Sequence, residues 1–310
     1  MGVTWGIVAT VKAPAGEILR FVAHHLELGA HRVFIYLDEE TPEALEALKA
    51  HPKARVFNCD AAYWEKRKRD RPDKHQSRQT ANATHAYNRA DVDWIAHVDV
   101  DEFIWPDAPL AERLAGLPDA CPTARMRPVE SLACAPDLYK AFVPAGSERD
   151  DTVRAIYPQY GAFVKGGFMS HVAGKLFART GRKKASFRIH NLFHAGQMVE
   201  GGTELDNVEL LHRHAKDWGR WLAAYRYRVT RGSYRPGMAP NVPVAHGGLS
   251  MHELLTGIEA EYGEAGLRAF YDEMNAVDPV VRQNLEERNM VLFRPLHLDE
   301  KLARHFPDFV

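Results

Sequence analysis

The chain has 310 residues with 40 basic and 41 acidic side chains. Its net charge of −1 excludes an overall positive charge that would attract nucleic acid or anionic membranes. Its 45% hydrophobic and 26% charged residues are typical of a globular protein with one large α/β domain, or one domain with an appendage. Three scattered cysteines exclude a C-x-x-C zinc site or a disulfide framework, and they suit a reducing cytoplasm. Neither a signal peptide nor a membrane-spanning segment is expected.

Short apolar runs alternate with amphipathic segments over the first sixty residues. Strands are expected over 5–12, 32–38 and 55–60, and helices over 17–28 and 41–50. This β-α-β-α-β order predicts a parallel sheet with right-handed crossovers, whose ligands bind outside the carboxyl ends of the strands. Four polar side chains stand at such ends, namely Lys12, Asp38, Asp60 and Asp99.

A strongly charged stretch over 63–75 is expected to be a solvated loop or helix face, in preference to a phosphate contact. The segment 77–89 then predicts a helix capped by Ser77, with Arg78, Gln79, Asn82 and Asn88 along it.

The segment 93–105 predicts a buried strand that runs into carboxylates. Side chains alternate along a strand, so His97, Asp99 and Asp101 are expected on one side of it. Carboxylates two residues apart repel each other, and a divalent cation with oxygen ligands would remove that conflict. Such a cation is most useful when the substrate carries phosphates. The alternative is an ordinary strand that ends in exposed acids.

The remainder of the chain is less regular. We expect a short helix over 110–114, strands over 123–130 and 174–179, a loop over 143–169, and helices over 217–228, 251–276, 279–289 and 298–305. The Pro- and Gly-rich stretch 232–248 is the best candidate for a domain boundary. The predicted domains are therefore 1–231, and 232–310 as a linker and helical extension that packs on the core. The aromatic, basic helix over 217–228 is expected to pack internally in preference to facing a membrane.

Several motifs occur in a telling order. They are Val11-Lys12, His25-x-x-x-Gly29, Phe34-Ile35-Tyr36-x-Asp38, Gln79-x-x-Asn82 and Asp93-Trp94-x-x-x-x-Asp99-x-Asp101-Glu102-Phe103. Together they resemble the GT-A-fold glycosyltransferases of the family-2-like group with a D-x-D-E-F motif. The resemblance implies an α/β, GT-A-like fold, as in nucleotide-diphospho-sugar transferases, with a mainly parallel sheet flanked by helices and a helical C-terminal extension. The chain departs from that group after its first two strands, which leaves the nucleotide base open.

The resemblance also implies roles for individual residues. Asp101 would bind Mn²⁺ or Mg²⁺ directly, Asp99 would reach the ribose or a metal-bound water, and His212 would be the third metal ligand, with His214 as the alternative. The base that deprotonates the acceptor would be Glu130, with Asp137 second, although Glu130 reads equally well as a salt-bridged strand acid. The implied donor-binding residues are Thr10, Lys12, Asp38, Asp60, Arg78, Asn82, Asp99 and Lys175. A zinc site is not expected, because the spacing of His190, His194, His212 and His214 fits no structural zinc pattern.

The implied reaction moves a sugar from a nucleotide-diphosphate sugar, with UDP favoured, to a hydroxyl of a glycan or glycolipid. Inversion is expected, in polysaccharide or glycolipid synthesis, in the cytoplasm or at the inner face of the membrane. No nucleic-acid partner is expected, and a homodimer is left open. Two alternatives stay open. A nucleotidyltransferase would carry a Gly-rich phosphate loop after the first strand, where this chain has Ala13-Pro14-Ala15-Gly16, and the other alternative is a non-catalytic sugar-binding protein on the same fold.

Overall fold

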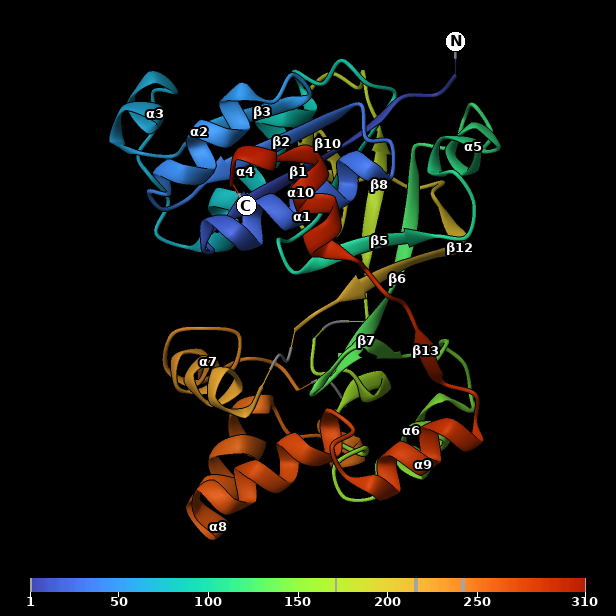
Figure 1. The fold of residues 1–310 in the computed structure, drawn as a ribbon. Helices are drawn as coiled ribbons and strands as arrows, with labels where there is room; N and C mark the ends of the chain where they lie inside the picture. The colour runs from blue at the N-terminus through green and yellow to red at the C-terminus, as the bar shows by residue number, and fades with distance from the viewer. Residues whose placement is uncertain (1, 171, 215–216, 241–242, 310) are drawn as a thin grey trace. The chain divides into compact units, whose positions relative to one another are not determined.

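The computed structural model describes residues 2–170, 172–214, 217–240 and 243–309 (Figure 1). Two compact units divide the chain. Unit 1 contains Met1–Arg127, Ala173–Leu210 and Leu296–Val310, and unit 2 contains Pro128–Val172 and Leu211–Pro295. The chain passes from one unit to the other four times, after residues 127, 172, 210 and 295. The predicted domains 1–231 and 232–310 stay a prediction.

Unit 1 is built on four parallel strands in the order β4-β1-β2-β3. They are β1 (Trp5–Val11), β2 (Arg32–Leu37), β3 (Ala54–Asn58) and β4 (Trp94–His97). The whole of β1 and of β4 is buried, as continuous apolar runs in a sheet covered on both faces predict. The helices that connect these strands are α1 (Ala15–Glu27), α2 (Pro42–Ala50), α3 (Ala61–Lys66) and α4 (His75–Tyr87).

Beyond β4 the pairing of unit 1 becomes antiparallel. Strand β8 (Lys175–Arg179) pairs with β4, the first half of β6 (Thr123–Leu132) pairs with β8, and β12 (Thr203–His212) pairs with β5 (Glu102–Pro106). The unit also contains α5 (Leu110–Ala115) and a small sheet of β9 (Ala185–Phe187), β10 (Leu192–His194) and β11 (Gln197–Met198). The α/β prediction is confirmed, with the parallel part confined to β1–β4.

The C-terminal helix α10 (Leu298–His305) belongs to unit 1 and packs against α1. Arg20 Nε donates to Asp299 Oδ1 at 2.6 Å, and Arg304 Nη2 donates to Glu27 Oε1 at 2.9 Å. The short helix η3 (Pro307–Phe309) follows α10. The end of the chain is thus held to its first helix by charged contacts at both ends of α10.

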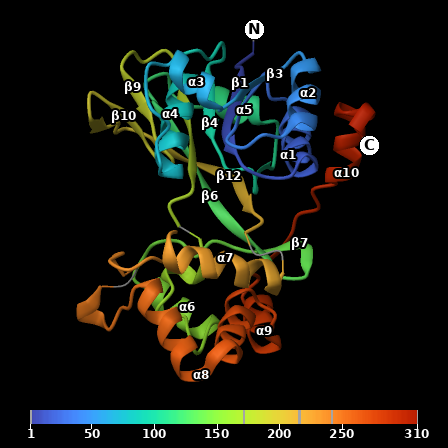
Figure 2. The ribbon, with the colours of Figure 1, turned by 90° about the vertical axis from the view of Figure 1, so that its left-hand side faces the viewer.

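Unit 2 combines a short antiparallel sheet with helices (Figure 2). The second half of β6 pairs with β7 (Ala135–Lys140), which pairs with β13 (Val291–Phe293). The helices are α6 (Arg149–Ile156), η1 (Lys165–Gly167), α7 (Trp218–Thr230), η2 (Val244–His246), α8 (Met251–Met274) and α9 (Pro279–Glu287). The predicted helical C-terminal part is confirmed.

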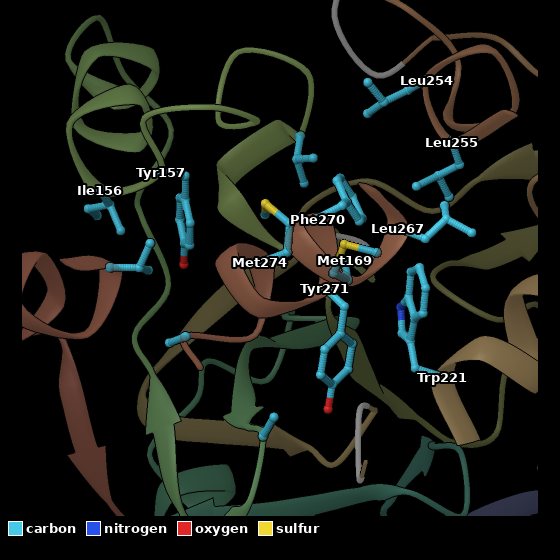
Figure 3. Close-up of a cluster of buried hydrophobic side chains, with 14 of the residues drawn as sticks. Ile156, Tyr157, Met169, Trp221, Leu254, Leu255, Leu267, Phe270, Tyr271 and Met274 are labelled. Carbon is cyan, nitrogen blue, oxygen red and sulfur yellow. The ribbon is translucent and has the colours of Figure 1, made fainter. Parts of the chain in front are cut away.

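The core of unit 2 gathers aromatic and aliphatic side chains from its helices (Figure 3). Trp221 stacks on Tyr225 at a ring-centroid distance of 5.7 Å and lies 5.6 Å from Tyr271. Side-chain caps fix where these helices begin. Asp217 accepts from the backbone of Arg220 at the start of α7, and Ser250 opens α8 with a capping box.

Three local predictions are wrong. The stretch 143–169, expected as a loop, contains α6, whose buried face holds Val153 and Ile156. Helix α4 begins at His75, so Ser77 lies inside its first turn instead of capping it. Strand β4 ends at His97, so Asp99 and Asp101 do not continue it. Within the described ranges, no helix combines the length and the apolar character needed to cross a membrane.

Candidate active site

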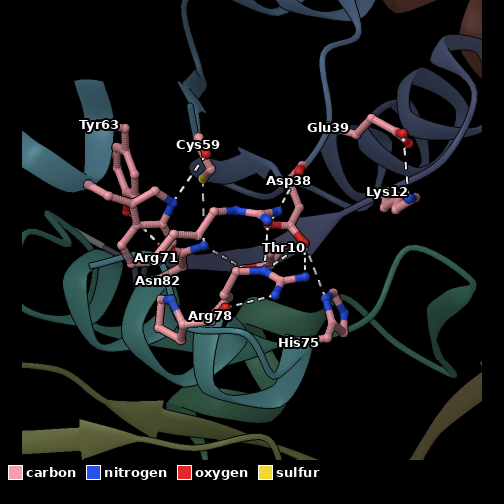
Figure 4. Close-up of polar contacts among 12 residues, drawn as sticks. Thr10, Lys12, Asp38, Glu39, Cys59, Tyr63, Arg71, His75, Arg78 and Asn82 are labelled. Atoms are coloured by element: carbon pink, nitrogen blue, oxygen red, sulfur yellow. Dashed lines mark hydrogen bonds and ion pairs between the residues drawn. The ribbon is translucent and has the colours of Figure 1, made fainter. Parts of the chain in front are cut away.

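Polar side chains gather at the carboxyl ends of β1 and β2 in unit 1 (Figure 4). Asp38 directly follows β2 and its side chain is 1% exposed. Arg78 on α4 donates to it through Nε, at 2.8 and 2.9 Å, and through Nη2 at 2.7 Å. Arg71 Nη2 donates to Asp38 Oδ1 at 3.0 Å, and His75 Nδ1 lies 3.3 Å from Oδ2. The carboxylate predicted to hold the nucleotide is therefore already enclosed by three basic side chains.

These contacts determine the charge of Asp38. Burial raises the pKa of its carboxyl group, but the hydrogen bonds from His75 and Arg78 and the charges of Arg78 and Arg71 outweigh burial and hold the pKa well below its usual range. Arg78 also donates through Nη1 to the backbone carbonyls of Pro72 and Asp73. Arg78 thus ties the charged stretch after α3 to the end of β2.

A second polar group lies on the neighbouring strand end. Asn82 is fully buried on α4 and donates to Thr10 Oγ1 on β1 at 3.2 Å. Its side-chain carbonyl accepts from the Tyr63 hydroxyl at 2.7 Å, and Arg67 donates to the same hydroxyl. The structure brings together Thr10, Asn82, Asp38 and Arg78, which the sequence named separately.

Asp99 and Asp101 lie in the turn between β4 and β5, where Glu102 N donates to Asp99 O at 3.0 Å. Both carboxylate oxygens of Asp99 are held: Gln79 Nε2 donates to Oδ1 at 2.6 Å, and Lys175 Nζ donates to Oδ2 at 2.6 Å. Asp101 is half-buried in the same turn. Asp99 is therefore fixed by protein donors.

Lys175 is fully buried at the start of β8, beside two acids. Its Nζ lies 2.6 Å from Asp99 Oδ2 and 3.3 Å from Glu102 Oε2. Burial lowers the pKa of Lys175, but the two carboxylates outweigh burial and hold the pKa above its ordinary value. Gly174 precedes it with φ +65°, and a Cβ there would meet Met126 O at 2.0 Å. The glycine is required by this close approach of β6, which places Lys175 beneath the turn.

Two predicted donor-binding residues lie in simpler surroundings. Lys12 is 64% exposed and pairs with Glu39 at 3.4 Å. Asp60 caps α3 by accepting from the backbone of Tyr63 at 2.8 Å, and Asn58 also donates to it. The cap accounts for Asp60 without a ligand.

Glu130 lies in unit 2 and is 2% exposed. It is the direct cross-strand neighbour of Lys140, whose Nζ lies 3.2 Å from Glu130 Oε2. The backbone N–H groups of Met169 and Ser170 and the Ser170 hydroxyl also donate to its carboxylate. Burial raises the pKa of Glu130, but Lys140, the nearby His214 and Ser170 outweigh burial and hold it at about 2. A base with so low a pKa removes a proton poorly at neutral pH, so these contacts fit the salt-bridged strand acid better.

The other predicted residues of unit 2 are placed less distinctively. Asp137 is half-buried on β7, where its backbone carbonyl accepts from Arg294 N at 2.8 Å. His212 ends β12, and its ring centroid lies 5.4 Å from that of His214. Lys216 lies outside the described residues. His212 is in unit 2 and Asp101 is in unit 1, so a metal site that they share stays a prediction.

The residues present suit one kind of metal site. Over the described ranges, no group of three or more His, Cys, Asp and Glu side chains is arranged to hold a metal ion. Mg²⁺ commonly binds through one or two carboxylates, with water and substrate phosphates completing its octahedron. Gln79 and Lys175 bind both oxygens of Asp99, and Asp101 is the other aspartate of the same turn.

Sequence reasoning missed the partners that decide these roles. The sequence predicts a solvated stretch for Arg71 and His75, and it indicates no role for Lys140. A basic stretch just before a helix that carries Arg78 was the available signal for the first two. For Lys140 the signal was a lysine directly after the apolar pair Leu138-Tyr139 in a strand, because a buried lysine needs an anionic partner.

Comparison with known proteins concerns the same region. Residues 8–114 match a family model. The matched stretch begins within β1 and ends within α5. The match is to glycosyltransferase family 92. It supports the predicted glycosyltransferase enzyme, whereas the predicted family-2-like group and its D-x-D-E-F motif are not shown. The match covers about a third of the chain. No curated protein matches the chain.

Solved structures give weaker likenesses. A CMP:2-keto-3-deoxy-manno-octonic acid synthetase complexed with CTP has 17% identity and a TM-score of 0.26, over 41% of this chain and 53% of that one. A mycobacterial protein has 13% identity and a TM-score of 0.35, over 76% and 77%. A galactosyltransferase in complex with donor and acceptor sugar analogues has 14% identity and a TM-score of 0.27, over 56% and 57%. The chain thus spans little more than half of the two named enzymes, and such TM-scores do not establish function.

Proposed function

We propose that this chain transfers a sugar from a nucleotide-diphosphate sugar to an acceptor hydroxyl, with Mn²⁺ or Mg²⁺ held at Asp101. The observation that carries the proposal is the group of polar side chains at the carboxyl ends of β1, β2 and β4, within the stretch that matches glycosyltransferase family 92. Ligands of parallel α/β sheets bind at this edge.

Each residue at this edge has a role in the proposal. Asp101 would hold the cation together with diphosphate oxygens and water, and the cation would stabilise the charge of the leaving diphosphate. Asp99, oriented by Gln79 and Lys175, would face the ribose or a water on the cation. Thr10 and Asn82 would line the nucleotide pocket.

The enclosure of Asp38 changes the role proposed for it. Three basic side chains already use its carboxylate, so it is better suited to positioning Arg71 than to binding the base itself. Arg71 is 47% exposed and would present its guanidinium to the donor. Guanidinium groups bind phosphate through paired N–H donors.

The acceptor hydroxyl needs a base of suitable pKa. Glu130, with a pKa of about 2, is fixed by its partners, so we propose Asp137 for this role. With no covalent nucleophile in the scheme, the anomeric centre would invert. The proposed donor is a UDP-sugar, and the proposed acceptor is a glycan or glycolipid.

The proposal is tested by thermal-shift measurements with nucleotide diphosphates and nucleotide sugars, with and without Mn²⁺ or Mg²⁺. A ligand that binds only the folded state raises the melting temperature. We expect a metal-dependent shift with one nucleotide, lost in Asp101→Asn and kept in the control Asp119→Asn, which changes an exposed aspartate of the same unit. An Asp101→Asn protein with an unchanged shift and full activity would rule out the metal role.

The same assay separates the alternative functions. Release of pyrophosphate from a nucleoside triphosphate and a sugar phosphate would identify a nucleotidyltransferase. Donor binding without hydrolysis or transfer to any acceptor would identify a binding protein on this fold.

A further inference from the structure

One stretch of unit 2 contains basic side chains and no acidic ones. The protein has 41 acidic residues, yet none lies between Trp218 and His252, while five arginines do. Three of the five make contacts inside the unit: Arg226 pairs with Glu259 on α8, Arg228 lies over the Tyr234 ring at 5.6 Å, and Arg220 Nε lies 3.5 Å from Asp217 Oδ2. The other two, at 231 and 235, are exposed.

The exposed arginines share a face with an exposed aromatic side chain. Positions 220 and 227 of α7 and its C-cap residue 231 are seven and four residues apart, which places them near one side of the helix. All three are exposed, and Tyr227 is 63% exposed. The opposite side of α7 holds the buried Trp221 and Tyr225. The outer face of α7 therefore presents an exposed tyrosine, with Arg231 beside it at the end of the helix.

The segment that follows α7 extends this character. It begins at the buried Tyr234, whose backbone carbonyl lies 2.9 Å from His252 Nδ1, and it returns at the buried Ser250, which caps α8. Among the described residues between these two anchors, Met238 is 38% exposed, Val244 74% and Leu249 38%.

Such exposure is unusual for apolar side chains in this protein. Among the described residues, nine large hydrophobic side chains are at least 36% exposed, and four of them lie between Tyr227 and Leu249. Scattered exposed apolar residues need no explanation, but a concentration of them beside basic residues marks an interaction site.

We propose that Tyr227, Arg231, Arg235, Met238, Val244 and Leu249 form a docking surface for an anionic lipid membrane. Arginines without an acid within the stretch are complementary to a negatively charged surface. Tyrosine is favoured at the boundary between headgroups and acyl chains, and exposed Met, Val and Leu side chains lose water when they enter it. A protein partner would need complementary acids and pockets, whereas a membrane needs only this mixture of charge and apolar area. The surface is independent of the proposed transfer reaction.

Vesicle flotation of the full chain tests the proposal. The probes are neutral phosphatidylcholine vesicles and vesicles of phosphatidylcholine with phosphatidylglycerol. The charge variant is Arg231→Glu with Arg235→Glu, and the apolar variant is Met238→Ser with Val244→Ser. Controls in unit 1 are Lys183→Glu with Lys184→Glu, and Met198→Ser, because these side chains are also exposed. Circular dichroism confirms that each variant is folded.

We expect wild type to float with anionic vesicles and not with neutral ones. Each basic residue near an anionic surface contributes roughly fivefold in affinity, so the charge variant should bind at least about 25-fold more weakly. Both controls should bind as wild type does, and 1 M salt should weaken binding by screening. The proposal is overturned if wild type does not float, if the controls lose as much as the variants, or if the apolar variant only converts a dimer into a monomer.

Discussion

Two buried lysines, one in each unit, each neutralise carboxylates, but they do so in different surroundings. In unit 2, Lys140 and Glu130 are direct cross-strand neighbours, and each side chain is at most 3% exposed. In unit 1, Lys175 reaches Asp99 and Glu102, and Asp99 is 29% exposed. The first pair is closed to solvent, and the second has one member at the surface.

The remaining hydrogen bonds explain the difference. Lys140 Nζ also donates to the carbonyls of Gly167 and Met274, each at 2.7 Å, so it ties three parts of unit 2 together. Lys175 instead serves the turn that holds the two predicted metal-site acids. The same chemical pair therefore supports the core in one unit and presents a carboxylate in the other. A buried carboxylate is evidence of function only when part of it faces a place that a ligand can reach.

The largest expected loss of stability comes from breaking the Lys140–Glu130 pair, which is closed to solvent. Lys140→Met would leave Glu130 charged and buried without its cation, which destabilises a protein by about 3–5 kcal/mol. Urea unfolding, with Lys49→Met as an exposed control, measures the loss. A loss below about 1 kcal/mol would show that the pair does not hold unit 2 together.

The pH dependence of stability follows from the same pair. The pKa of Glu130 falls from 4.5 to about 2 on folding, so its contribution is complete above pH 4.5 and is lost as the pH falls toward 2. The difference corresponds to about 3 kcal/mol. Stability measured between pH 7 and 2 should fall in this window in wild type. Glu130→Gln should flatten that part of the curve, and an unchanged curve would contradict the assignment.

Breaking the contact of Lys175 with Asp99, which is partly exposed, should lower the free energy of unfolding by less. In Lys175→Met, Asp99 can regain water, and Glu102 still accepts from the Asp99 backbone at 2.8 Å. We expect about 1–3 kcal/mol of destabilisation. The metal-dependent thermal shift with nucleotide should disappear, because Asp99 loses its orientation. If Lys175→Met cost as much as Lys140→Met and kept the nucleotide shift, the contrast between the two pairs would be wrong.

The smallest effect concerns Asp60. Asp60→Ala should cost about 1 kcal/mol through loss of the α3 cap, and Asp60→Ser should recover most of it. Differential scanning calorimetry resolves the difference. Neither variant should alter nucleotide binding, and a loss of binding in Asp60→Ser would restore its predicted role in the donor site.

Much of the fold could be predicted from local patterns. Strands β1 and β2 and helices α2 and α10 lie within a residue of their predicted limits, and β3 within two. Continuous apolar runs and a proline at the start of α2 act locally, which is why they can be recognised in the sequence. The β4–β5 turn and α6 were mispredicted. The apolar alternation around Asp99 continues through a turn, and α6 is stabilised by packing against α9, which is far along the chain.

The sequence by itself determined the alternating α/β order of unit 1, the placement of acids after its strands and the charge bias between Trp218 and His252, because these depend only on neighbours along the chain. Tertiary structure alone decided which acids are held. Asp38 meets Arg78, Asp99 meets Lys175, and Glu130 meets Lys140. The cations of the first two pairs stand tens of residues away from their acids, and that of the third faces Glu130 across a pair of strands. The charge and reach of a carboxylate depend on the partners that folding brings within about 3 Å of it.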